Sequence, residues 1–478
     1  MSSLPVSPQP LRDPAADLAR RHQALGSPYT LTSNDLLQRQ SERESNARSY
    51  PRRIPLALRR AAGVYVEDVD GRVFIDCLAG AGTLALGHNH PVVREAIQQA
   101  LDDGLPLHTL DLTTPVKDRY VQALFDSLPA EFARNAKIQF CGPTGADAIE
   151  AALKLVRIST GRSTVLAFHG AYHGMTQGAL NLMGNLGPKA ALHGTLSNVQ
   201  FMPYPYDYRC PFGLGGDAGA QAGLHYLRTV LKDPESGVPA PAAIVTELVQ
   251  GEGGVVCAPD AWTRGLRHLA SEAGTPLLVD EVQTGLGRTG KLYAFEHAGI
   301  VPDVLVLSKA IGGGLPMSVV IYRGDFDQWR PGSHAGTFRG NQLAMAAGTA
   351  TLRHIEQEGL AARSAELGRH LRGRLEQLQG RHACIGDVRG RGLMVGVELI
   401  DPQAGSDALG YPTAASALAS AVQTECLRRG LILELGGRHG SVLRLLPPLI
   451  ITAAELDRVC EILDLALVEA VRPLATAA

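Results

Sequence analysis

The chain has 478 residues, of which 45% are hydrophobic and 19% are charged, and its formal net charge is −2. This length is sufficient for two or three domains with a large core, and the composition is that of a globular protein. The nearly balanced charge argues against nucleic acid or an anionic membrane as a partner, so any anionic ligand must be bound by local geometry.

The cysteines and the N-terminal residues indicate the cellular compartment of the protein. Seven cysteines are scattered without a CxxC pair, which predicts a reducing, cytoplasmic environment and neither a disulfide framework nor a zinc module. No apolar run approaches the roughly 18 residues of a membrane helix, and the first residues lack the pattern of a secretory signal. We therefore expect no membrane segment and no metal site. Residues 1–30, rich in Pro, Ala and Arg, are expected to be a mobile leader.

The segment 31–95 contains a predicted β-hairpin. Residues 63–76 alternate apolar and polar side chains around Asp70-Gly71, a dipeptide typical of tight hairpin turns. We expect this segment to join the C-terminal part of the chain in a smaller domain.

The region 96–345 is predicted to be a large α/β domain. Short apolar segments alternate there with helical stretches, the pattern of a mostly parallel sheet covered by helices on both faces. The predicted strands are 138–140, 165–168, 243–246, 277–280, 304–307 and 318–322. An insert at 203–240, rich in Tyr, Pro and Gly, is predicted to be a loop over this sheet.

The pattern changes in the remaining residues, 346–478. Long helices are predicted around 388–399 and 431–446. A final helix is predicted after Thr452-Ala-Ala-Glu455, a capping box followed by apolar residues at helical spacing. We expect these residues to form the smaller α+β domain together with 31–95.

One lysine stands at the end of a predicted buried strand. The run Val304-Leu-Val-Leu-Ser-Lys309 leads into Ala-Ile-Gly-Gly-Gly, where the glycines end the strand abruptly. A lysine at the mouth of such a strand is partly desolvated, which lowers its pKa and provides a neutral, nucleophilic amine. Schiff-base chemistry requires an amine of that kind.

A carboxylate ends a second strand of the same type, in the run Pro276-Leu-Leu-Val-Asp280. We expect the two strand ends to be neighbours. An amine and a carboxylate placed in this way suit pyridoxal phosphate, whose carbonyl reacts with a lysine and whose ring nitrogen requires an acidic partner.

The segment 140–157 predicts a strand, a tight turn and an amphipathic helix. Gly142 and Gly145 allow close approach of the backbone, and the free N–H groups and dipole of a helix N-terminus favour a phosphate. An ordinary strand-to-helix turn would have the same pattern. Tyr172 follows the next predicted strand, where it could stack on a planar ring or pack in the core.

Two further motifs resemble those of nucleotide-binding and metal-binding proteins. Residues 285–290 match GxGxxG and nearly match a triphosphate-binding loop, but Leu292 replaces the hydroxyl that would hold magnesium. No acidic residue lies about 20 positions beyond Gly290, so a nucleotide-binding oxidoreductase or switch protein is the weaker alternative to a turn-rich loop. His88 and His90 lack a third ligand cluster, and a capping or packing role is expected.

Together these features resemble the class III aminotransferases, which depend on pyridoxal phosphate and adopt fold type I, with a large, mostly parallel sheet domain and a smaller α+β domain from both ends of the chain. The resemblance runs from about residue 65 to 448. It implies that Lys309 forms the Schiff base with the cofactor and that Asp280 pairs with the pyridinium nitrogen. The remaining cofactor-binding residues that it implies are Val282 and Tyr172 on the ring faces, Gln283 at the ring hydroxyl, Thr144, Gly145 and Ala146 at the phosphate, and His173 and Glu247.

The resemblance also implies a shared site and a substrate switch. Thr337 resembles the phosphate ligand that a neighbouring subunit donates, which implies a homodimer or a higher oligomer. Arg444 would bind the α-carboxylate of glutamate or 2-oxoglutarate, and Glu252 would mask it when the amine donor binds. Two half-reactions at one site predict ping-pong kinetics.

Three runs, 77–91, 107–115 and 141–144, narrow the resemblance to the aminotransferases that act on 2,4-diaminobutyrate and 2-oxoglutarate, of the siderophore-pathway rather than the ectoine-pathway type. The implied reaction is reversible transfer of the 4-amino group, giving aspartate 4-semialdehyde and glutamate. Met175 stands where enzymes for 4-aminobutyrate or ornithine usually carry arginine. An enzyme of the family for such another ω-amino acid, and a mutase or decarboxylase of the same fold, are the alternatives. A cofactor-free relative is disfavoured by the intact Lys309 and Asp280.

Overall fold

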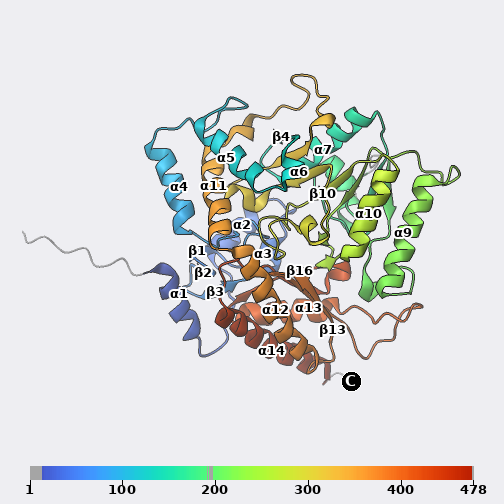
Figure 1. The fold of residues 1–478 in the computed structure, drawn as a ribbon. Coiled ribbons are helices and arrows are strands. Elements are labelled where there is room, and N and C mark those ends of the chain that lie inside the picture. The colour runs from blue at the N-terminus through green and yellow to red at the C-terminus, as the bar shows by residue number, and fades with distance from the viewer. Residues whose placement is uncertain (1–12, 191, 193–197, 476–478) are drawn as a thin grey trace, which may run out of the picture.

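The computed structural model describes residues 13–190, 192 and 198–475 (Figure 1). The first twelve residues of the predicted leader lie outside the described residues. A large sheet with its helices occupies the upper part of the view in Figure 1, and a smaller group of strands and helices lies below it.

A seven-stranded sheet forms the centre of the large domain, in the order β4-β12-β11-β10-β7-β5-β6. Six of its strands run in one direction, and β12 runs in the opposite direction. The strands are β4 (Ala136–Phe140), β5 (Val165–Phe168), β6 (Val199–Met202), β7 (Ala243–Thr246), β10 (Leu277–Asp280), β11 (Val304–Leu307) and β12 (Val319–Arg323). The predicted strands and the mostly parallel sheet are confirmed. The central strands β5, β7, β10 and β11 are buried along their whole length, which explains why they are continuous apolar runs.

Helices cover this sheet, and α7 packs on β7, β11 and β12. The helices of the region are α4 (Pro91–Asp102), α5 (Pro115–Asp126), α6 (Ala130–Ala133), α7 (Gly145–Thr160), α8 (Gln177–Asn181), α9 (Gly216–Lys232), α10 (Asp260–Glu272) and α11 (Gln342–Gln357). The prediction of a loop over 203–240 is wrong, because α9 occupies half of it and packs beside α10 (Figure 1). A Cβ at Gly265 would lie 2.5 Å from Leu224, so glycine permits this close approach.

The smaller domain combines both ends of the chain, as predicted, because β15 pairs in parallel with β3. One of its sheets has the order β1-β2-β3-β15 and another the order β13-β14-β17-β16. Its strands are β1 (Leu58–Ala62), β2 (Tyr65–Asp68), β3 (Val73–Asp76), β13 (Ile385–Arg391), β14 (Met394–Leu399), β15 (Leu431–Ile432), β16 (Glu434–Gly436) and β17 (Val442–Leu445). A separate pair, β8 (Val249–Gln250) and β9 (Val256–Cys257), lies between β7 and β10 in the sequence. Its helices are α1 (Pro14–Gln23), α2 (Asp35–Arg43), α3 (Tyr50–Arg53), α12 (Leu360–Gln379), α13 (Ser416–Arg428) and α14 (Ala453–Ala475).

Two predictions in the terminal regions are confirmed and two are wrong. The hairpin β2–β3 and the capping box of Thr452 and Glu455 are present. The helices predicted at 388–399 and 431–446 are strands instead, because β14 and β17 are buried on both faces and their continuous apolar runs do not show the strand period. The leader is not mobile over α1, whose Leu18 is buried and whose His22 Nε2 lies 2.9 Å from Gly430 O.

Among the described residues, no helix is long and apolar enough to cross a membrane. All seven cysteines are unpaired.

Candidate active site

The carboxyl ends of six parallel strands lie at one edge of the large sheet, where α/β proteins commonly bind ligands. The predicted cofactor residues follow these ends. They are Thr144 after β4, Tyr172 and His173 after β5, Glu247 after β7, Asp280 at the end of β10 and Lys309 after β11. The topology therefore brings residues that are far apart in the sequence to a single edge.

Lys309 begins the short 3-10 helix η4 (Lys309–Gly312) directly after β11. Its φ of 51° lies in the left-handed region, which costs a non-glycine residue about 1–3 kcal/mol and is concentrated at functional positions. Within the described part of the chain its side chain has no hydrogen bond or ion pair. Burial lowers the pKa of Lys309 against the opposing charge of Glu252, which confirms the expected direction.

Asp280 and His173 form a buried pair. Asp280 Oδ2 lies 2.7 Å from His173 Nδ1, and Asp280 Oδ1 accepts a hydrogen bond of 2.9 Å from Val282 N. Burial alone would lower the pKa of His173, but the hydrogen bond and charge of Asp280 outweigh it and the pKa is raised. The pair fixes the direction of a carboxylate in a place from which water is excluded.

Glu247 connects the loops that follow β5 and β7. Its two carboxylate oxygens accept hydrogen bonds from Tyr172 N at 2.9 Å and from Gly251 N at 3.0 Å. Burial raises the pKa of Glu247 to about 7, with His173 opposing and Asp280 adding to the shift. Because its partners are backbone amides, Glu247 positions these loops.

The N-terminus of α7 is the candidate phosphate site. Thr144 and Asp147 form a capping box, in which Asp147 Oδ2 accepts from Thr144 N at 2.9 Å and from the Thr144 hydroxyl at 2.7 Å. Among the described residues no acceptor faces the amides of Gly145 and Ala146, and a helix N-terminus with free amides attracts an anion. A Cβ at Gly145 would lie 2.9 Å from Val282 Cγ1, so glycine brings this helix end against the loop after β10.

Gln283 joins the cofactor residues to the substrate residues. Its amide nitrogen donates to Ala81 O at 3.2 Å, and its Oε1 accepts from Arg444 Nη2 at 3.3 Å. A Cβ at Gly251 would lie 1.8 Å from that Oε1, so only glycine fits there.

Arg444, on β17, is fully buried and faces two carboxylates. Its Nη1 lies 2.7 Å from Glu252 Oε1 and 3.3 Å from Glu434 Oε2. Burial alone would raise the pKa of Glu252, but Arg444 holds it below its ordinary value. A Cβ at Gly436 would lie 2.4 Å from Arg444 Cδ, so a glycine on β16 makes room for the arginine. The structure thus brings together the predicted Arg–Glu pair.

Sequence reasoning missed Glu434 and Tyr50. Glu434 lies directly opposite Arg444 in the β16–β17 ladder, and its Oε1 accepts a hydrogen bond of 2.8 Å from the hydroxyl of Tyr50 on α3. The available indication was a single carboxylate within the apolar run Leu431-Ile-Leu-Glu434-Leu, since an unpaired charge is rarely buried in a core.

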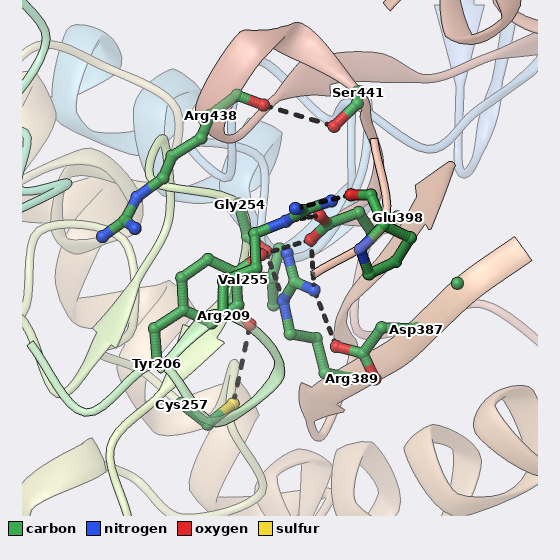
Figure 2. A network of polar contacts seen from close by, with 12 residues as sticks. Tyr206, Arg209, Gly254, Val255, Cys257, Asp387, Arg389, Glu398, Arg438 and Ser441 are labelled. Atoms are coloured by element: carbon green, nitrogen blue, oxygen red, sulfur yellow. Dashed lines mark hydrogen bonds and ion pairs between the residues drawn. The ribbon is translucent and has the colours of Figure 1, made fainter. Parts of the chain in front are cut away.

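A polar network around Glu398 reaches Gly254, two residues after Glu252 in the sequence (Figure 2). Glu398 accepts from Arg209 Nε at 2.5 Å and from Arg389 Nη1 at 2.8 Å, and it also binds the Tyr206 hydroxyl. Arg389 Nε donates to Gly254 O at 2.8 Å. Asp387 completes the charge balance at 2.7 Å from Arg389 Nη1. The network therefore anchors the backbone two residues after Glu252.

Two predicted residues do not join this group in the described chain. Thr337 begins the short helix η6 (Thr337–Gly340), is exposed, and makes no side-chain hydrogen bond within the described part of the chain. Its loop packs on 107–112, where Thr109 N donates to Gly340 O at 3.2 Å. Met175 is also exposed, at 56% of its surface.

The other sequence motifs have structural roles. Residues 285–290 form consecutive turns, as predicted. His88 Nε2 lies 2.7 Å from Asp76 Oδ2, and the ring of His90 packs against that of His354 with centroids 4.7 Å apart.

Comparison with known proteins identifies relatives over most of the chain. The family model Aminotransferase class-III matches residues 47–467. A Diaminobutyrate--2-oxoglutarate aminotransferase of Rhizobium meliloti (strain 1021) is 60% identical over 423 residues, 88% of this chain and 90% of that protein. A protein of the same name from Haemophilus influenzae is 51% identical over 89% of this chain and 94% of that protein. The crystal structure of an amine transaminase from an uncultivated Pseudomonas species, in its PLP-bound form, matches with a TM-score of 0.79 at 27% identity, covering 90% of this chain and 98% of that one.

The residues present here fit pyridoxal phosphate. The Lys309 amine has no partner in the described structure, the Asp280 carboxylate is buried beside His173 and Val282 N, and the first amides of α7 are free. These are an amine, an anion and an anion-binding helix end, which match the three polar features of that cofactor. The chain belongs to the class-III aminotransferases, which depend on pyridoxal phosphate.

Proposed function

We propose that this protein transfers the 4-amino group of 2,4-diaminobutyrate to 2-oxoglutarate, giving aspartate 4-semialdehyde and glutamate in a reversible reaction. The observation that carries the proposal is the 60% and 51% identity, each over nearly nine tenths of the chain, to two proteins named for that donor and acceptor. The arrangement of Lys309, Asp280 and Arg444 supports it, because it supplies an amine, an acidic partner and a carboxylate clamp.

Pyridoxal phosphate supplies, when bound, a carbonyl that takes up amino groups and a ring that accepts electrons. Lys309 would hold it through its amine and, once freed by the incoming amino group, would move the substrate proton as a general base. Its lowered pKa favours the neutral amine that both roles need. Asp280 would hold the proton on the ring nitrogen, and His173 keeps that carboxylate in place at 2.7 Å.

The surrounding residues orient the cofactor. The α7 amides of Gly145 and Ala146 would bind the phosphate, with Thr144 as the helix cap. Val282 and Tyr172 would hold the ring, and Glu247 fixes the backbone of Tyr172.

Arg444 and Glu252 allow one site to serve two substrates. When glutamate or 2-oxoglutarate binds, Arg444 binds its α-carboxylate, for which a guanidinium is well suited. When the amine donor binds, the ion pair of 2.7 Å between Glu252 and Arg444 neutralises the arginine. The two half-reactions then alternate in ping-pong order.

The proposal includes a homodimer in which each subunit completes the other's site. The loop of Thr337 and the segment 107–112 beside it present exposed apolar side chains that a second copy would cover, since apolar patches on a surface usually mark an interface. They are Leu107, Leu110, Leu112 and Phe338, each 49% or more exposed. Thr337 would reach the phosphate bound to the partner. The unpaired cysteines fit the cytoplasmic location that we expect.

A comparison of donors tests the proposed function. With 2-oxoglutarate as acceptor, kcat/KM should be highest for 2,4-diaminobutyrate, lower for ornithine and lowest for 4-aminobutyrate, because Met175 offers no charge to a donor's carboxylate. Pyruvate should be a poor acceptor, because Arg444 and Glu252 serve the five-carbon acid. Preference for 4-aminobutyrate or ornithine would leave only the general aminotransferase assignment.

A further inference from the structure

The cluster around Arg444 contains more negative than positive charge. Among the described residues, Arg444 is the cation within ion-pair distance of the cluster, at 2.7 Å from Glu252 and 3.3 Å from Glu434. Arg53 is farther away and acts on Glu252 through its charge. Lys309 also acts on Glu434 through its charge, but burial lowers the pKa of the lysine, which favours its neutral form. Within ion-pair distance, two carboxylates therefore share one cation.

Glu434 is the carboxylate that lacks a full set of partners. It is 7% exposed, and its Oε2 has no hydrogen bond within the described part of the chain. Its other oxygen, Oε1, accepts the hydroxyl of Tyr50 at 2.8 Å. A buried charged oxygen without a donor costs several kcal/mol.

A purely structural role for Glu434 does not explain why its Oε2 lacks a hydrogen-bond donor. Arg444 Nη1 lies within ion-pair distance of Glu434, but neither Nη1 nor Oε2 makes a hydrogen bond among the described residues. Glu252 alone already neutralises the arginine at the shorter distance of 2.7 Å. Glu434 is thus a carboxylate held in direction by Tyr50 and left with one oxygen free.

We propose that Glu434 binds the α-ammonium group of the amine donor and so selects a diamino acid over a simple ω-amino acid. This inference rests on the proposed function and names the residue that gives it specificity. When the 4-amino group reacts, 2,4-diaminobutyrate still carries an ammonium at its α-carbon, which supplies the missing cation and the missing donor for Oε2.

The closest simple analogue lacks that group. 4-Aminobutyrate differs from 2,4-diaminobutyrate only by the α-amino group, so it leaves the Glu434 oxygen buried and unpaired. A site that pairs a buried polar group with its substrate rejects the analogue that lacks the partner. Glutamate reacts through its own α-amino group and has no second ammonium, so its half-reaction does not use this contact.

Exchange of donors in a Glu434→Gln variant tests the proposal. Glutamine keeps the shape and removes the charge, so kcat/KM for 2,4-diaminobutyrate should fall by about 30-fold or more. The values for 4-aminobutyrate and for the glutamate half-reaction should stay within about threefold, as reference reactions in the same variant. Glu434→Asp keeps the charge and should restore part of the preference.

The outcomes distinguish failure of the proposed function from failure of the role assigned to Glu434. If the wild-type holoenzyme does not use 2,4-diaminobutyrate, the proposed function fails. If the wild type does use it, the ratio of kcat/KM for 2,4-diaminobutyrate to kcat/KM for 4-aminobutyrate decides the inference. A ratio that Glu434→Gln leaves unchanged, whether both values fall or neither does, means that Glu434 only supports Arg444 and overturns the inference.

Binding without turnover at the 4-position provides a second measurement. L-Homoserine keeps the α-ammonium and has a hydroxyl in place of the 4-amino group, and 4-hydroxybutyrate lacks the ammonium as well. In calorimetry with the Lys309→Ala variant, homoserine should bind more tightly than 4-hydroxybutyrate, and Glu434→Gln should remove most of that difference. An unchanged difference would contradict the assigned contact.

The contact also predicts a pH dependence. The charged and titratable groups facing Glu434 are Tyr50 on α3, Arg444 on β17, Glu252 after β8 and Lys309 on η4. Burial raises the pKa of Glu434 against Arg444, and Glu252 raises it further. As pH falls through this pKa, kcat/KM for 2,4-diaminobutyrate should fall more steeply than that for 4-aminobutyrate. In Glu434→Gln the two profiles should be parallel, and persistence of the difference would assign it to another group.

Discussion

Asp280 is the residue on which the proposed chemistry depends most after Lys309 itself. Asp280→Ala removes the charge that we propose keeps the ring nitrogen protonated, and it leaves His173 without its partner at 2.7 Å. We expect kcat to fall by at least about 100-fold, while far-ultraviolet circular dichroism remains that of the wild type. Asp280→Glu, which keeps the charge, should retain more activity than the alanine variant. Near-normal turnover of Asp280→Ala would refute the electron-accepting role of the ring.

Single residues were predictable where a strand end marks them. Lys309 and Asp280 follow continuous apolar runs, so their position at the sheet edge could be read from the sequence. Glu434 could not be placed, because the same kind of apolar run around it was interpreted as a helix. Its partner Tyr50 lies 384 positions away in the sequence, and only the folded chain brings the two together.

Glu281, beside Asp280, stabilises the loop that contains the turns of residues 285–290. It accepts hydrogen bonds from Ala294 N and Phe295 N at 2.9 Å and from the Thr284 hydroxyl at 2.8 Å. Burial nevertheless raises its pKa from 4.5 to about 7. Between these two values the folded protein binds more protons than the unfolded chain, so the free energy of unfolding falls as pH rises, by up to about 3 kcal/mol from this group.

Urea unfolding at pH 5 and pH 8 measures this contribution. The wild type should lose stability between the two values, and Glu281→Gln should lose less, because glutamine does not titrate. Glu469→Gln, a substitution on the outer face of α14, should keep the wild-type slope. Equal slopes for wild type and Glu281→Gln would contradict the prediction.

The network of Figure 2 makes a prediction for the Glu252 loop. Arg389→Met removes the hydrogen bond of 2.8 Å to Gly254 O and loosens the backbone that carries Glu252. In the proposed switch diaminobutyrate needs Glu252 on Arg444, so its kcat/KM should fall about tenfold, and the value for glutamate should change by less than about threefold. Arg458→Met, at a surface pair on α14, is the control. A parallel fall for both substrates would show that the network only supports the fold.

Elements were predictable where burial differs between faces or turns are strongly marked. The β2–β3 hairpin follows from its alternation and the Asp70-Gly71 turn, and α14 from its capping box. The strands β14 and β17 were missed because both of their faces are buried, which removes alternation. Helix α9 was missed because glycines and alanines within it weaken its apolar stripe.

At the scale of the whole molecule, the proposed sharing of sites between subunits is open to a mixing experiment. Lys309→Ala and Thr337→Ala should each have low activity alone, the second through poor retention of the cofactor. A mixed dimer contains one site with both lesions and one with neither, so unfolding and refolding the two variants together should restore activity. Properly mixed dimers without any recovery would show that Thr337 serves its own subunit or none.

The absorption spectrum of the holoenzyme during a single half-reaction tests whether a cofactor held by Lys309 carries the amino group from 2,4-diaminobutyrate to 2-oxoglutarate. With 2,4-diaminobutyrate alone, the bound cofactor should change its absorption completely and release one equivalent of aspartate 4-semialdehyde for each site. Addition of 2-oxoglutarate should restore the starting spectrum and form one equivalent of glutamate, and borohydride should then attach the cofactor to the peptide that contains Lys309. A spectrum that 2,4-diaminobutyrate leaves unchanged would contradict the proposed donor, and a label on a different lysine would contradict the role of Lys309.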